Sequence, residues 1–429
     1  MAKVLVLGAG FVAGPLVNTL LNDPRNELTV ASQFLADAEK LAGTRQRVKA
    51  QAVDVNDDND LHQQIAAHDI VVSLVPYQFH AQIARQCIAT RRHLITASYE
   101  NNDIKALSAE AKSAGITVLN EMGLDPGIDH LSAMKIIDEV HADDGRILSF
   151  ESWCGGLPSP SANTNPLGYK FSWAPRSVLQ ALLNNAKYLK NGQQVQLTSD
   201  QLLAQPETLQ ISDSLVLEGY PNRDSMGYQH VYGLRDVNTM LRGTLRYPGF
   251  CDILQSCKAL GLLNTQPDER LMSSATPITW SQLLPDANRQ LANASAQVKD
   301  AIKWLGVLSD AVAPAQGTVI DAFCELLKHK LSYQVGETDM VVLQHRFEVR
   351  DRHAKTHWRY STLVCEGEPG GVSAMAKTVG VPCALAAQLL LDGGISQRGS
   401  ILPITSSIYT PLLKQLAMEG IRFEEVDRE

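Results

Sequence analysis

The sequence is poor in cysteine and lacks paired cysteines. Its 429 residues include seven cysteines, an odd number, and no two of them form a C-x-x-C arrangement. A disulfide framework and a zinc site both need such pairs, so neither is expected and no metal site is predicted. This sparse use of cysteine is typical of a reducing compartment.

The sequence also has no long stretch of positive charge and no leader segment. The formal net charge is −8, which argues against nucleic acid as the main partner. The chain enters an apolar run at residues 3–7 without the features of a signal peptide. No apolar run of 18 residues stands out, so no membrane span is expected. These absences predict a cytoplasmic protein.

Short apolar runs alternate with helical patterns through the first 120 residues. Strands are expected at residues 3–7, 27–31, 48–55, 69–75, 93–97 and 116–119. Helices are expected at residues 11–22, 35–42, 78–90 and 103–114. Alternation of this kind predicts an α/β fold with a doubly wound parallel sheet, a Rossmann-type domain.

The pattern after residue 120 is less regular and predicts a second α/β region. A chain of this length is expected to form two or three domains. We expect a helix at 128–140, a strand at 147–153 that ends in a glycine turn, helices at 176–190 and 285–330, strands at 337–349 and 357–365, and helices at 373–390 and 410–419.

The first strand leads into a glycine loop, Gly8-Ala9-Gly10-Phe11-Val12-Ala13. Gly8 permits the tight turn, Gly10 lets the backbone approach a pyrophosphate, and the small Ala13 allows the helix to pack near the strand. The helix N-terminus then supplies amide groups for the phosphates. A tight turn in an unrelated α/β protein is the alternative, but the surrounding alternation favours a dinucleotide.

The end of the second strand indicates which dinucleotide would bind. An NAD enzyme usually carries Asp or Glu there, whereas this strand ends in Ser32 and Gln33. An acid would repel a 2′-phosphate and Ser32 can donate a hydrogen bond to one, so the sequence favours NADP(H). Arg45 and Arg47 are candidate positive partners, and NAD remains an alternative.

Polar and aromatic residues follow the later strands, at the edge of the sheet where ligands bind. Ser73-Leu74-Val75 closes the fourth strand and Ser98-Tyr99 follows the fifth. Tyr99 and Asp125 are candidate substrate contacts, although Asp125 or Asp129 can also cap the next helix. His130 is interpreted as a buried, hydrogen-bonded histidine.

A cysteine and two arginine motifs come later in the chain. Cys154 lies beside the expected glycine turn, where a lone cysteine is usually a small buried hydrophobe and less often part of a site. The motifs at 220–225 and 242–247 contain Arg223 and Arg246. Arginine binds carboxylates through two parallel hydrogen bonds. Two such motifs favour a substrate with several carboxylates, and surface ion pairs are the alternative.

Taken together, these motifs resemble one family. The chain resembles the saccharopine reductases, the glutamate-forming saccharopine dehydrogenases, over nearly its whole length. The resemblance rests on Gly-x-Gly-Phe-Val-Ala at 8–13, Val-Ser-Leu-Val-Pro-Tyr at 72–77, Asn-Glu-Met-Gly-Leu-Asp-Pro-Gly-Ile-Asp-His at 120–130, Cys-Gly-Gly-Leu-Pro at 154–158, Asn-Pro-Leu-Gly-Tyr-Lys-Phe-Ser-Trp at 165–173, Tyr-Pro-Asn-Arg-Asp-Ser at 220–225, Arg-Gly-Thr-Leu-Arg-Tyr at 242–247 and Asp-Met-Val-Val-Leu-Gln-His at 339–345.

The resemblance implies an NADP-linked oxidoreductase of lysine metabolism. In such enzymes allysine (2-aminoadipate 6-semialdehyde) and L-glutamate condense to an imine, which NADPH reduces to saccharopine; the reverse reaction oxidises and hydrolyses saccharopine. It also implies a homodimer. The implied parts are a Rossmann domain at 1–124 joined by the tail at about 390–429, a substrate and dimerisation domain with a mixed sheet at 125–250 and 331–389, and a helical insertion at 251–330.

The resemblance also implies site residues. Those that would hold the substrate are Tyr99, Asp125, Asn222, Arg223, Thr244 and Arg246. Asp125, Tyr99 and Cys154 would be the catalytic candidates, with Cys154 near the reacting carbon. The expected cofactor contacts are Gly8, Gly10, Phe11, Val12, Ser32, Gln33, Ser73, Leu74, Val75, Ser98 and Leu124.

One departure and two alternatives remain. The family commonly has an arginine after the second strand, where this chain has Gln33, so the cofactor preference stays open. A related imine-reducing enzyme of polyamine metabolism, similar to carboxynorspermidine synthase, should show an acidic pocket for its cationic amine. A non-catalytic dinucleotide sensor is the second alternative, and the joint presence of Tyr99, Asp125, Arg223 and Arg246 argues against it.

Overall fold

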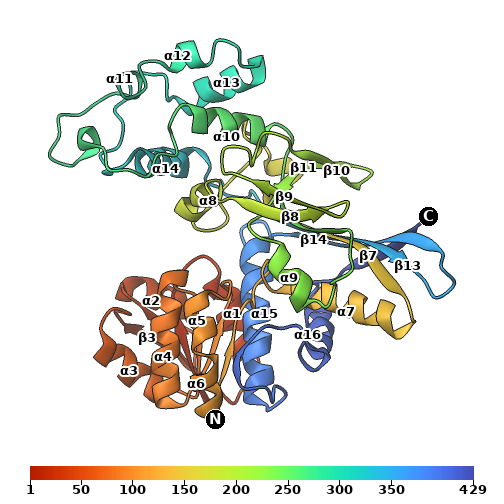
Figure 1. Ribbon diagram of the computed structural model, residues 1–429. Helices are drawn as coiled ribbons and strands as arrows, with labels where there is room; N and C mark the ends of the chain where they lie inside the picture. Colours follow the sequence, from red (N-terminus) through yellow and green to blue (C-terminus); the bar gives the residue numbers. More distant parts are fainter. The chain divides into compact units, whose positions relative to one another are not determined.

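The structure, a computed structural model, describes residues 1–429 and divides into two compact units (Figure 1). The first unit contains Met1–Asp144 and Gly371–Phe423, and the second contains Gly145–Gly370 and Glu424–Glu429. Each unit is therefore built from two separate stretches of the chain. The glycine loop belongs to the first unit, and both arginine motifs belong to the second.

The first unit is built on a seven-stranded sheet of order β15-β6-β5-β4-β1-β2-β3. Every pair of neighbouring strands is parallel. Residues 4–7 are apolar and fully buried because helices cover both faces. This confirms the predicted doubly wound sheet. The strands are β1 (Ala2–Leu7), β2 (Asn26–Ser32), β3 (Val48–Ala52), β4 (Ile70–Ser73), β5 (His93–Thr96), β6 (Thr117–Leu119) and β15 (Gly399–Ile401).

Helices from both ends of the sequence pack on this sheet. They are α1 (Ala13–Leu21), α2 (Leu35–Ala42), α3 (Asp58–Ala66), α4 (His80–Thr90), α5 (Asn102–Ala106), α6 (Ser108–Ser113), α7 (Ile128–Ala142), α15 (Ala374–Leu391) and α16 (Ser406–Met418), with a short 3₁₀ turn η1 (Tyr77–Phe79). Leu61 of α3 and Ile83 of α4 share a buried cluster with Leu5 and Val71 of the sheet. α15, from the C-terminal stretch, packs against α1 (Figure 1).

The contact between α1 and α15 depends on a glycine in the middle of α15. A Cβ atom at Gly380 would lie 2.6 Å from the carbonyl oxygen of Val12 and 2.9 Å from the backbone nitrogen of Leu16. Both distances are too short for a carbon atom. Glycine inside a helix costs about 1 kcal/mol relative to alanine, and this close approach is the physical reason for it. The C-terminal segment thus packs directly on the start of α1.

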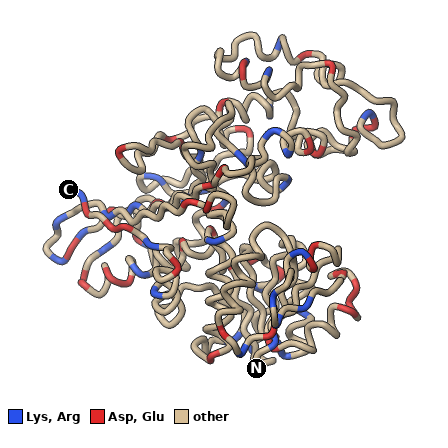
Figure 2. Tube along the Cα trace, turned by 180° about the vertical axis from the view of Figure 1, so that it is seen from behind, with Lys and Arg blue, Asp and Glu red and all other residues tan.

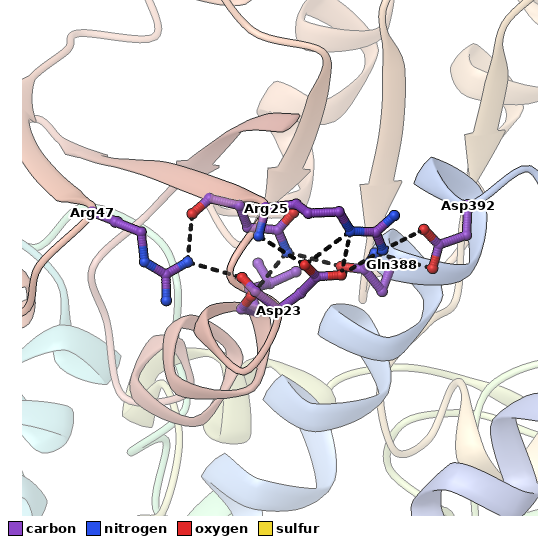
Figure 3. Close-up of polar contacts among 7 residues, drawn as sticks. Asp23, Arg25, Arg47, Gln388 and Asp392 are labelled. Carbon is purple, nitrogen blue, oxygen red and sulfur yellow. Dashed lines mark hydrogen bonds and ion pairs between the residues drawn. The ribbon is translucent and has the colours of Figure 1, made fainter. Parts of the chain in front are cut away.

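Polar contacts join the same two segments near the start of β2 (Figure 3). Arg25 forms ion pairs with Asp23 at 2.5 Å and with Asp392 at 2.8 Å. The Arg25 side chain is exposed, so water screens both pairs. Asn26 Nδ2 donates to Gln388 Oε1 at 2.8 Å, and Asn26 is buried. The buried amide contact is therefore the stronger link between β2 and α15.

The second unit is built on a nine-stranded mixed sheet. The main path has the order β10-β11-β12-β7-β13-β14-β16, and β8 pairs with both β12 and β9. β7 and β12 are parallel, and the other pairs are antiparallel. The strands are β7 (Arg146–Pro158), β8 (Ala186–Lys190), β9 (Gln193–Leu197), β10 (Glu207–Ser212), β11 (Leu215–Pro221), β12 (Thr239–Arg246), β13 (Asp339–Arg350), β14 (Thr356–Glu366) and β16 (Glu424–Arg428).

The helices of the second unit gather mainly at residues 250–330. They are α8 (Pro175–Ala181), α9 (Met226–Val231), α10 (Phe250–Ala259), α11 (Trp280–Leu283), α12 (Ala287–Gln290), α13 (Ala296–Leu305) and α14 (Val319–Lys330), with 3₁₀ turns η2 (Pro160–Ala162) and η3 (Glu269–Leu271). Phe250, Ile302 and Phe323 of these helices share one buried cluster with Tyr169 and Tyr220. The helical segment thus completes a core that also includes residues of the sheet.

The unit boundaries differ from the predicted domain boundaries. The sequence places residues 125–144 and 371–389 in the second domain and residues 424–429 in the first. In the structure α7 packs on α16 and α15 packs on α1, whereas β16 pairs with β14. Each segment therefore belongs to the other unit. Contacts between distant parts of the chain set these boundaries, and no local pattern records them.

Three local predictions are also wrong. The strand expected to end at 153 continues as β7 to Pro158, because Gly155 and Gly156 pair with β13. A Cβ atom at Gly155 would lie 2.7 Å from the Leu245 carbonyl oxygen, so this glycine serves close packing on β12 instead of a turn. The helix expected at 176–190 ends at Ala181, and β8 follows. The helix expected at 285–330 is divided into α12, α13 and α14.

One helix contradicts the expectation that no segment is apolar enough to span a membrane. α15 has 18 residues and a mean hydropathy of 1.5, which meets the criteria of length and composition. However, 72% of it is buried inside the protein, where it packs on α1, β4 and β5. A helix buried on most sides is apolar on most sides, so burial explains the composition of α15.

Candidate functional site

The glycine loop joins β1 to α1 at the carboxyl edge of the first sheet. Gly8 has a φ of +107°, and a Cβ atom there would lie 3.2 Å from the Leu74 carbonyl carbon. At Gly10 a Cβ would have no neighbour within 4 Å, and α1 begins without a side-chain cap. The Ala13 backbone nitrogen donates to the Gly10 carbonyl oxygen at 3.2 Å, and Pro15 has no N–H. The open backbone at Gly10 is therefore the feature that fits the close approach of a dinucleotide pyrophosphate.

Most of the predicted cofactor contacts are at least partly exposed in the structure. Their accessible positions follow the ends of β1, β2, β4 and β5, which the parallel sheet brings to one edge. The exposed or half-buried residues are Gly8, Gly10, Phe11, Val12, Ser32, Gln33, Leu74, Val75 and Ser98. Ser73 and Leu124 are buried, so their side chains pack inside the unit.

The two arginines named as candidate positive partners for the 2′-phosphate lie away from Ser32. Arg47 donates to the carbonyl oxygen of Asn26, at 2.8 Å, where β2 begins (Figure 3). Asn26 and Ser32 are at opposite ends of β2, about 20 Å apart at about 3.3 Å per residue. Arg45 donates to Asn18 Oδ1 in the second turn of α1, at 3.0 Å. Backbone and amide oxygens hold both side chains, so neither arginine is the positive partner that the sequence left open.

A buried histidine ties the ends of β4 and β5 together. His80 Nδ1 lies 3.1 Å from Ser73 Oγ, and its Nε2 lies 2.9 Å from both Thr96 Oγ1 and Ser98 Oγ. Burial lowers the pKa of His80 to about 4, because charging an imidazole away from water is unfavourable. The ring is therefore neutral at neutral pH. It fixes the strand end that leads to Tyr99.

Tyr99 and Asp125 meet in the first unit. The Tyr99 hydroxyl donates to Asp125 Oδ1 at 3.1 Å, and both side chains are half-buried. Tyr99 follows β5 and Asp125 follows β6, so neighbouring parallel strands deliver the pair to the cofactor edge. The two predicted catalytic candidates of this unit thus form one hydrogen-bonded pair. Asp129, the alternative cap, instead accepts from the Gly127 backbone nitrogen at 2.6 Å.

A buried carboxylate supports the loop that carries Asp125. Glu121 Oε1 accepts from the Glu100 backbone nitrogen at 3.0 Å, and Glu121 Oε2 lies 2.7 Å from His130 Nε2. Glu121 and His130 are 3% and 0% exposed. Glu121 also has a φ of +57°, a left-handed conformation that costs a non-glycine residue about 1–2 kcal/mol. Such strain persists only where the surrounding structure fixes the residue.

In the second unit, Cys154, Tyr220 and Thr244 occupy one row across three strands. Thr244 of β12 lies opposite Cys154 of β7 and opposite Tyr220 of β11. Residues directly opposite each other point to the same face of a sheet. Tyr220 and Thr244 are joined by a side-chain hydrogen bond, and burial raises the pKa of Tyr220 to about 12. Two predicted site residues, Cys154 and Thr244, therefore share one face.

Arg246 lies on the same face, two residues beyond Thr244 on β12. Its guanidinium carbon is 5.0 Å from the ring centre of Tyr169, 5.1 Å from that of Phe250 and 5.9 Å from that of Tyr220. The side chain is 6% exposed and donates to the Leu245 carbonyl oxygen, while its Nε has no hydrogen-bond partner. Aromatic faces stabilise the cation but leave its donors able to bind an anion.

Asn222 and Arg223 lie farther along the same strands. The Asn222 backbone nitrogen donates to the Arg242 carbonyl oxygen at 2.8 Å. Position 242 is four residues from Arg246, or about 14 Å at about 3.4 Å per residue. Arg223 is exposed and has a φ of +53°. The two arginines of the motifs are thus widely separated, which suits an extended ligand with an anionic group at each end.

Sequence reasoning missed the groups that support these residues. The aromatic groups around Arg246 come from positions 169, 220 and 250, which no local pattern connects. His80 was not singled out, and His130 was interpreted as a buried histidine, which is confirmed. Glu121 has no signal of its own beyond its place beside Met122-Gly123. Tyr99 and Asp125 were found because ligands bind at the carboxyl ends of parallel strands. That reasoning identifies residues at the ligand edge and not the buried residues that support them.

Comparison with protein families matches nearly the whole chain. Residues 4–119 match the family model described as the saccharopine dehydrogenase NADP binding domain. Residues 123–421 match the one described as the saccharopine dehydrogenase C-terminal domain. A protein of Pyricularia oryzae named saccharopine dehydrogenase [NADP(+), L-glutamate-forming] is 40% identical, and the match covers 99% of this chain and 98% of that protein.

Two solved structures resemble this fold to different degrees. The apo saccharopine dehydrogenase (L-Glu forming) of Saccharomyces cerevisiae is 39% identical, covers 100% of both chains and gives a TM-score of 0.91. The homospermidine synthase of Legionella pneumophila, solved in complex with NAD, is 9% identical and gives a TM-score of 0.57. That match covers 100% of this chain and 91% of the other. At such low identity it shows a shared fold alone.

Proposed function

This chain belongs to the saccharopine dehydrogenase family, and from this we propose that it is an NADP-dependent oxidoreductase that forms and cleaves saccharopine. In one direction allysine and L-glutamate lose water to form an imine, which is reduced to saccharopine. In the other direction saccharopine is oxidised and the imine is hydrolysed. The observation that carries this proposal is 40% identity to the P. oryzae enzyme over almost the full length of both chains.

The first unit supports NADP(H) as the cofactor. Residues 4–119 match an NADP-binding family model. The glycine loop has open space at Gly10 for a pyrophosphate, and β2 ends in Ser32 without an acid. The bound cofactor would supply or accept the hydride. We propose that Ser32 donates a hydrogen bond to the 2′-phosphate. NAD is the weaker alternative, because an NAD site usually has Asp or Glu at this position.

The second unit supports a substrate with several carboxylates. We propose that Arg246 binds one carboxylate through its guanidinium donors, which are surrounded by aromatic rings and make no ion pair within the protein. Arg223 would bind a second carboxylate, with Asn222 and Thr244 as neutral hydrogen-bonding partners. A carboxylate buried without such partners would be very unfavourable, so a substrate of this charge requires them.

In the first unit, Tyr99 and Asp125 are the groups proposed to serve the proton transfers of the reaction. Formation and hydrolysis of the imine both require protons to move to and from nitrogen and oxygen. A hydrogen-bonded tyrosine–aspartate pair can hold a proton or order a water at such a centre. Cys154 stands in the same row as Thr244, and we propose that it lines the site beside the substrate.

A polyamine enzyme is the second candidate, because homospermidine synthase has the same fold. The environment of Arg246 favours the carboxylate substrate: a buried guanidinium would repel a cationic amine, whereas a polyamine site needs acidic groups. A non-catalytic sensor is less favoured still, because it would need neither the Tyr99–Asp125 pair nor the arginine motifs.

We further propose that the protein is a cytoplasmic homodimer without nucleic-acid or membrane partners. All seven cysteines are buried and none forms a disulfide, which suits a reducing compartment. Acidic and basic residues are interspersed in both units (Figure 2), so no single basic stripe suggests nucleic acid. The half-buried Trp358 and Tyr360 and the 48% exposed Val364 lie on one face of β14, which offers an apolar surface to a second copy.

The forward reaction tests the proposed function. The oxidation of NADPH is followed with allysine and L-glutamate together, with each alone, and with a diamine in place of L-glutamate. We expect a rate only when allysine and L-glutamate are both present. A comparable or higher rate with the diamine would support the polyamine enzyme. Binding of NADPH without any rate would support the sensor.

A further inference from the structure

Buried groups form hydrogen bonds with both sequence neighbours of Tyr99, Ser98 and Glu100. On one side the Ser98 hydroxyl lies 2.9 Å from His80 Nε2. On the other side the Glu100 backbone nitrogen donates to Glu121 Oε1 at 3.0 Å. The Glu121 backbone nitrogen also donates to the Ser98 carbonyl oxygen at 3.1 Å. The segment around Tyr99 is therefore tied to Glu121 through two hydrogen bonds.

The same carboxylate ties down the loop that carries Asp125. Glu121 Oε2 lies 2.7 Å from Nε2 of His130, in the first turn of α7. Asp125 lies between Glu121 and His130 in the sequence, so the contact closes the loop that leads from β6 into α7. Both partners are almost completely buried, and neither reaches the surface where a substrate would bind. Glu121 also keeps its left-handed backbone.

We propose that Glu121 and His130 are positioning residues for Tyr99 and Asp125. The carboxylate bridges the segment after β5 and the loop after β6. It thereby sets the distance between the Tyr99 hydroxyl and Asp125 Oδ1, which is 3.1 Å. The kinetic part of this inference rests on the proposed function. A displacement of about 1 Å in such a pair can lower turnover about 100-fold, even when the mutated residue does not itself touch the substrate.

The test compares Glu121→Ala, Glu121→Gln and a control in the same unit. Glu121→Ala removes both contacts, whereas Glu121→Gln keeps an oxygen for the Glu100 amide. Asn26→Ala is the control. Asn26 is also buried and hydrogen-bonded, but it lies at the start of β2, at the edge of the sheet opposite to the one that carries Tyr99 and Asp125. The kcat for saccharopine oxidation and the KM for NADP are measured for each. Hydrogen exchange of residues 98–101 is measured without substrate.

We expect kcat to fall about 30- to 100-fold in Glu121→Ala, with the KM for NADP within threefold of the wild-type value. Glu121→Gln should recover at least a third of the wild-type kcat. Exchange at residues 98–101 should accelerate in Glu121→Ala and stay unchanged in Asn26→Ala. A role confined to stability would lower the unfolding temperature of both alanine variants and leave kcat unaltered in both.

Three results would overturn the proposal: a folded Glu121→Ala variant with kcat within threefold of wild type, an equal loss of kcat in Asn26→Ala, or unaltered exchange at residues 98–101. If Glu121→Ala does not fold, His130→Ala takes its place, and an unaltered kcat there has the same meaning. If the wild-type protein does not oxidise saccharopine, the proposed function fails, and the exchange measurement alone decides the positioning role.

Discussion

Arg246 has the surroundings that bear most directly on the substrate. It is a buried cation on a sheet, with aromatic rings around it and a single backbone acceptor from within the protein. The sequence predicted an arginine that binds a carboxylate but not the rings, because Tyr169, Tyr220 and Phe250 are contributed by three distant segments. At the scale of residues, the sequence thus predicted the type and position of a site residue but not the side chains that surround it.

Replacing Arg246 tests its role. Arg246→Met should lower kcat/KM for saccharopine about 10- to 150-fold, since hydrogen bonds to a charged group contribute about 1.5–3 kcal/mol. Arg246→Lys should recover only part, because an ammonium cannot form the two parallel bonds of a guanidinium. Arg176→Met is the control: Arg176 pairs with Asp321 at a half-exposed site of the same unit, so kcat/KM should not alter. Equal losses in both methionine variants would contradict the assignment.

His80 should make the stability of the protein depend on pH. Its pKa is about 4 in the folded protein because of burial and about 6.5 in the unfolded chain. Below pH 6.5 the unfolded state binds a proton that the folded state does not. The stabilising contribution is therefore complete above pH 6.5 and is lost as the pH falls to 4, by about 3 kcal/mol at most.

Urea unfolding between pH 7.5 and pH 4.5 measures this loss. The difference in unfolding free energy between the wild type and His80→Gln isolates the contribution of His80 from those of other titrating groups. We expect that difference to shrink as the pH falls, because the variant has no imidazole to protonate. Parallel curves for the two proteins would mean that His80 does not titrate in this range.

At the scale of elements, the sequence predicted the secondary structure of segments with a clear local pattern. It failed where packing against a neighbouring element determines the structure. The six strands of residues 1–119 are as expected, since apolar runs buried on both faces leave a clear local pattern. The polar helix α3 was not predicted, and the helix expected at 103–114 is divided into α5 and α6. Gly155 and Gly156 were expected to form a turn, yet both pair with β13 as part of β7, and Gly155 makes room for β12.

The packing of α15 on α1 yields a prediction at this scale. Gly380→Ala should weaken NADP binding and lower the unfolding temperature, because the new Cβ would displace the first turn of α1, beside the glycine loop. Gly227→Ala is the matched control: it lies in α9, and a Cβ there meets nothing within 4 Å. Its better helix propensity should leave stability equal or slightly raised. Unaltered NADP affinity in Gly380→Ala would contradict the role of this contact.

At the scale of the whole molecule, the first unit is discontinuous in sequence. Residues 371–423 provide α15, which packs on α1, and β15, which pairs with β6. The expected tail at about 390–429 recognised part of this arrangement, but it missed α15 and included β16, which pairs with β14. The composition of α15 resembles that of any buried helix, so its own residues could not predict the unit in which it packs.

The discontinuity predicts how fragments behave. Residues 1–144 alone should not unfold cooperatively or bind NADPH, because the face of α1 and the edge of β6 would be exposed to water. A fusion of residues 1–144 to 371–423 through a flexible linker should do both, as measured by calorimetry and by NADPH fluorescence. Tight NADPH binding by residues 1–144 alone would show that the C-terminal segment is dispensable for the unit.

The proposed NADP-dependent oxidation of saccharopine is tested by the initial rate of saccharopine-dependent reduction of NADP, measured in parallel with NAD. We expect a clear rate with NADP and a much lower rate with NAD, because β2 ends in Ser32 without an acid. A rate with NAD alone would keep the reaction but contradict the cofactor assignment. No rate with either nucleotide, from folded protein that binds one of them, would contradict the proposed function itself.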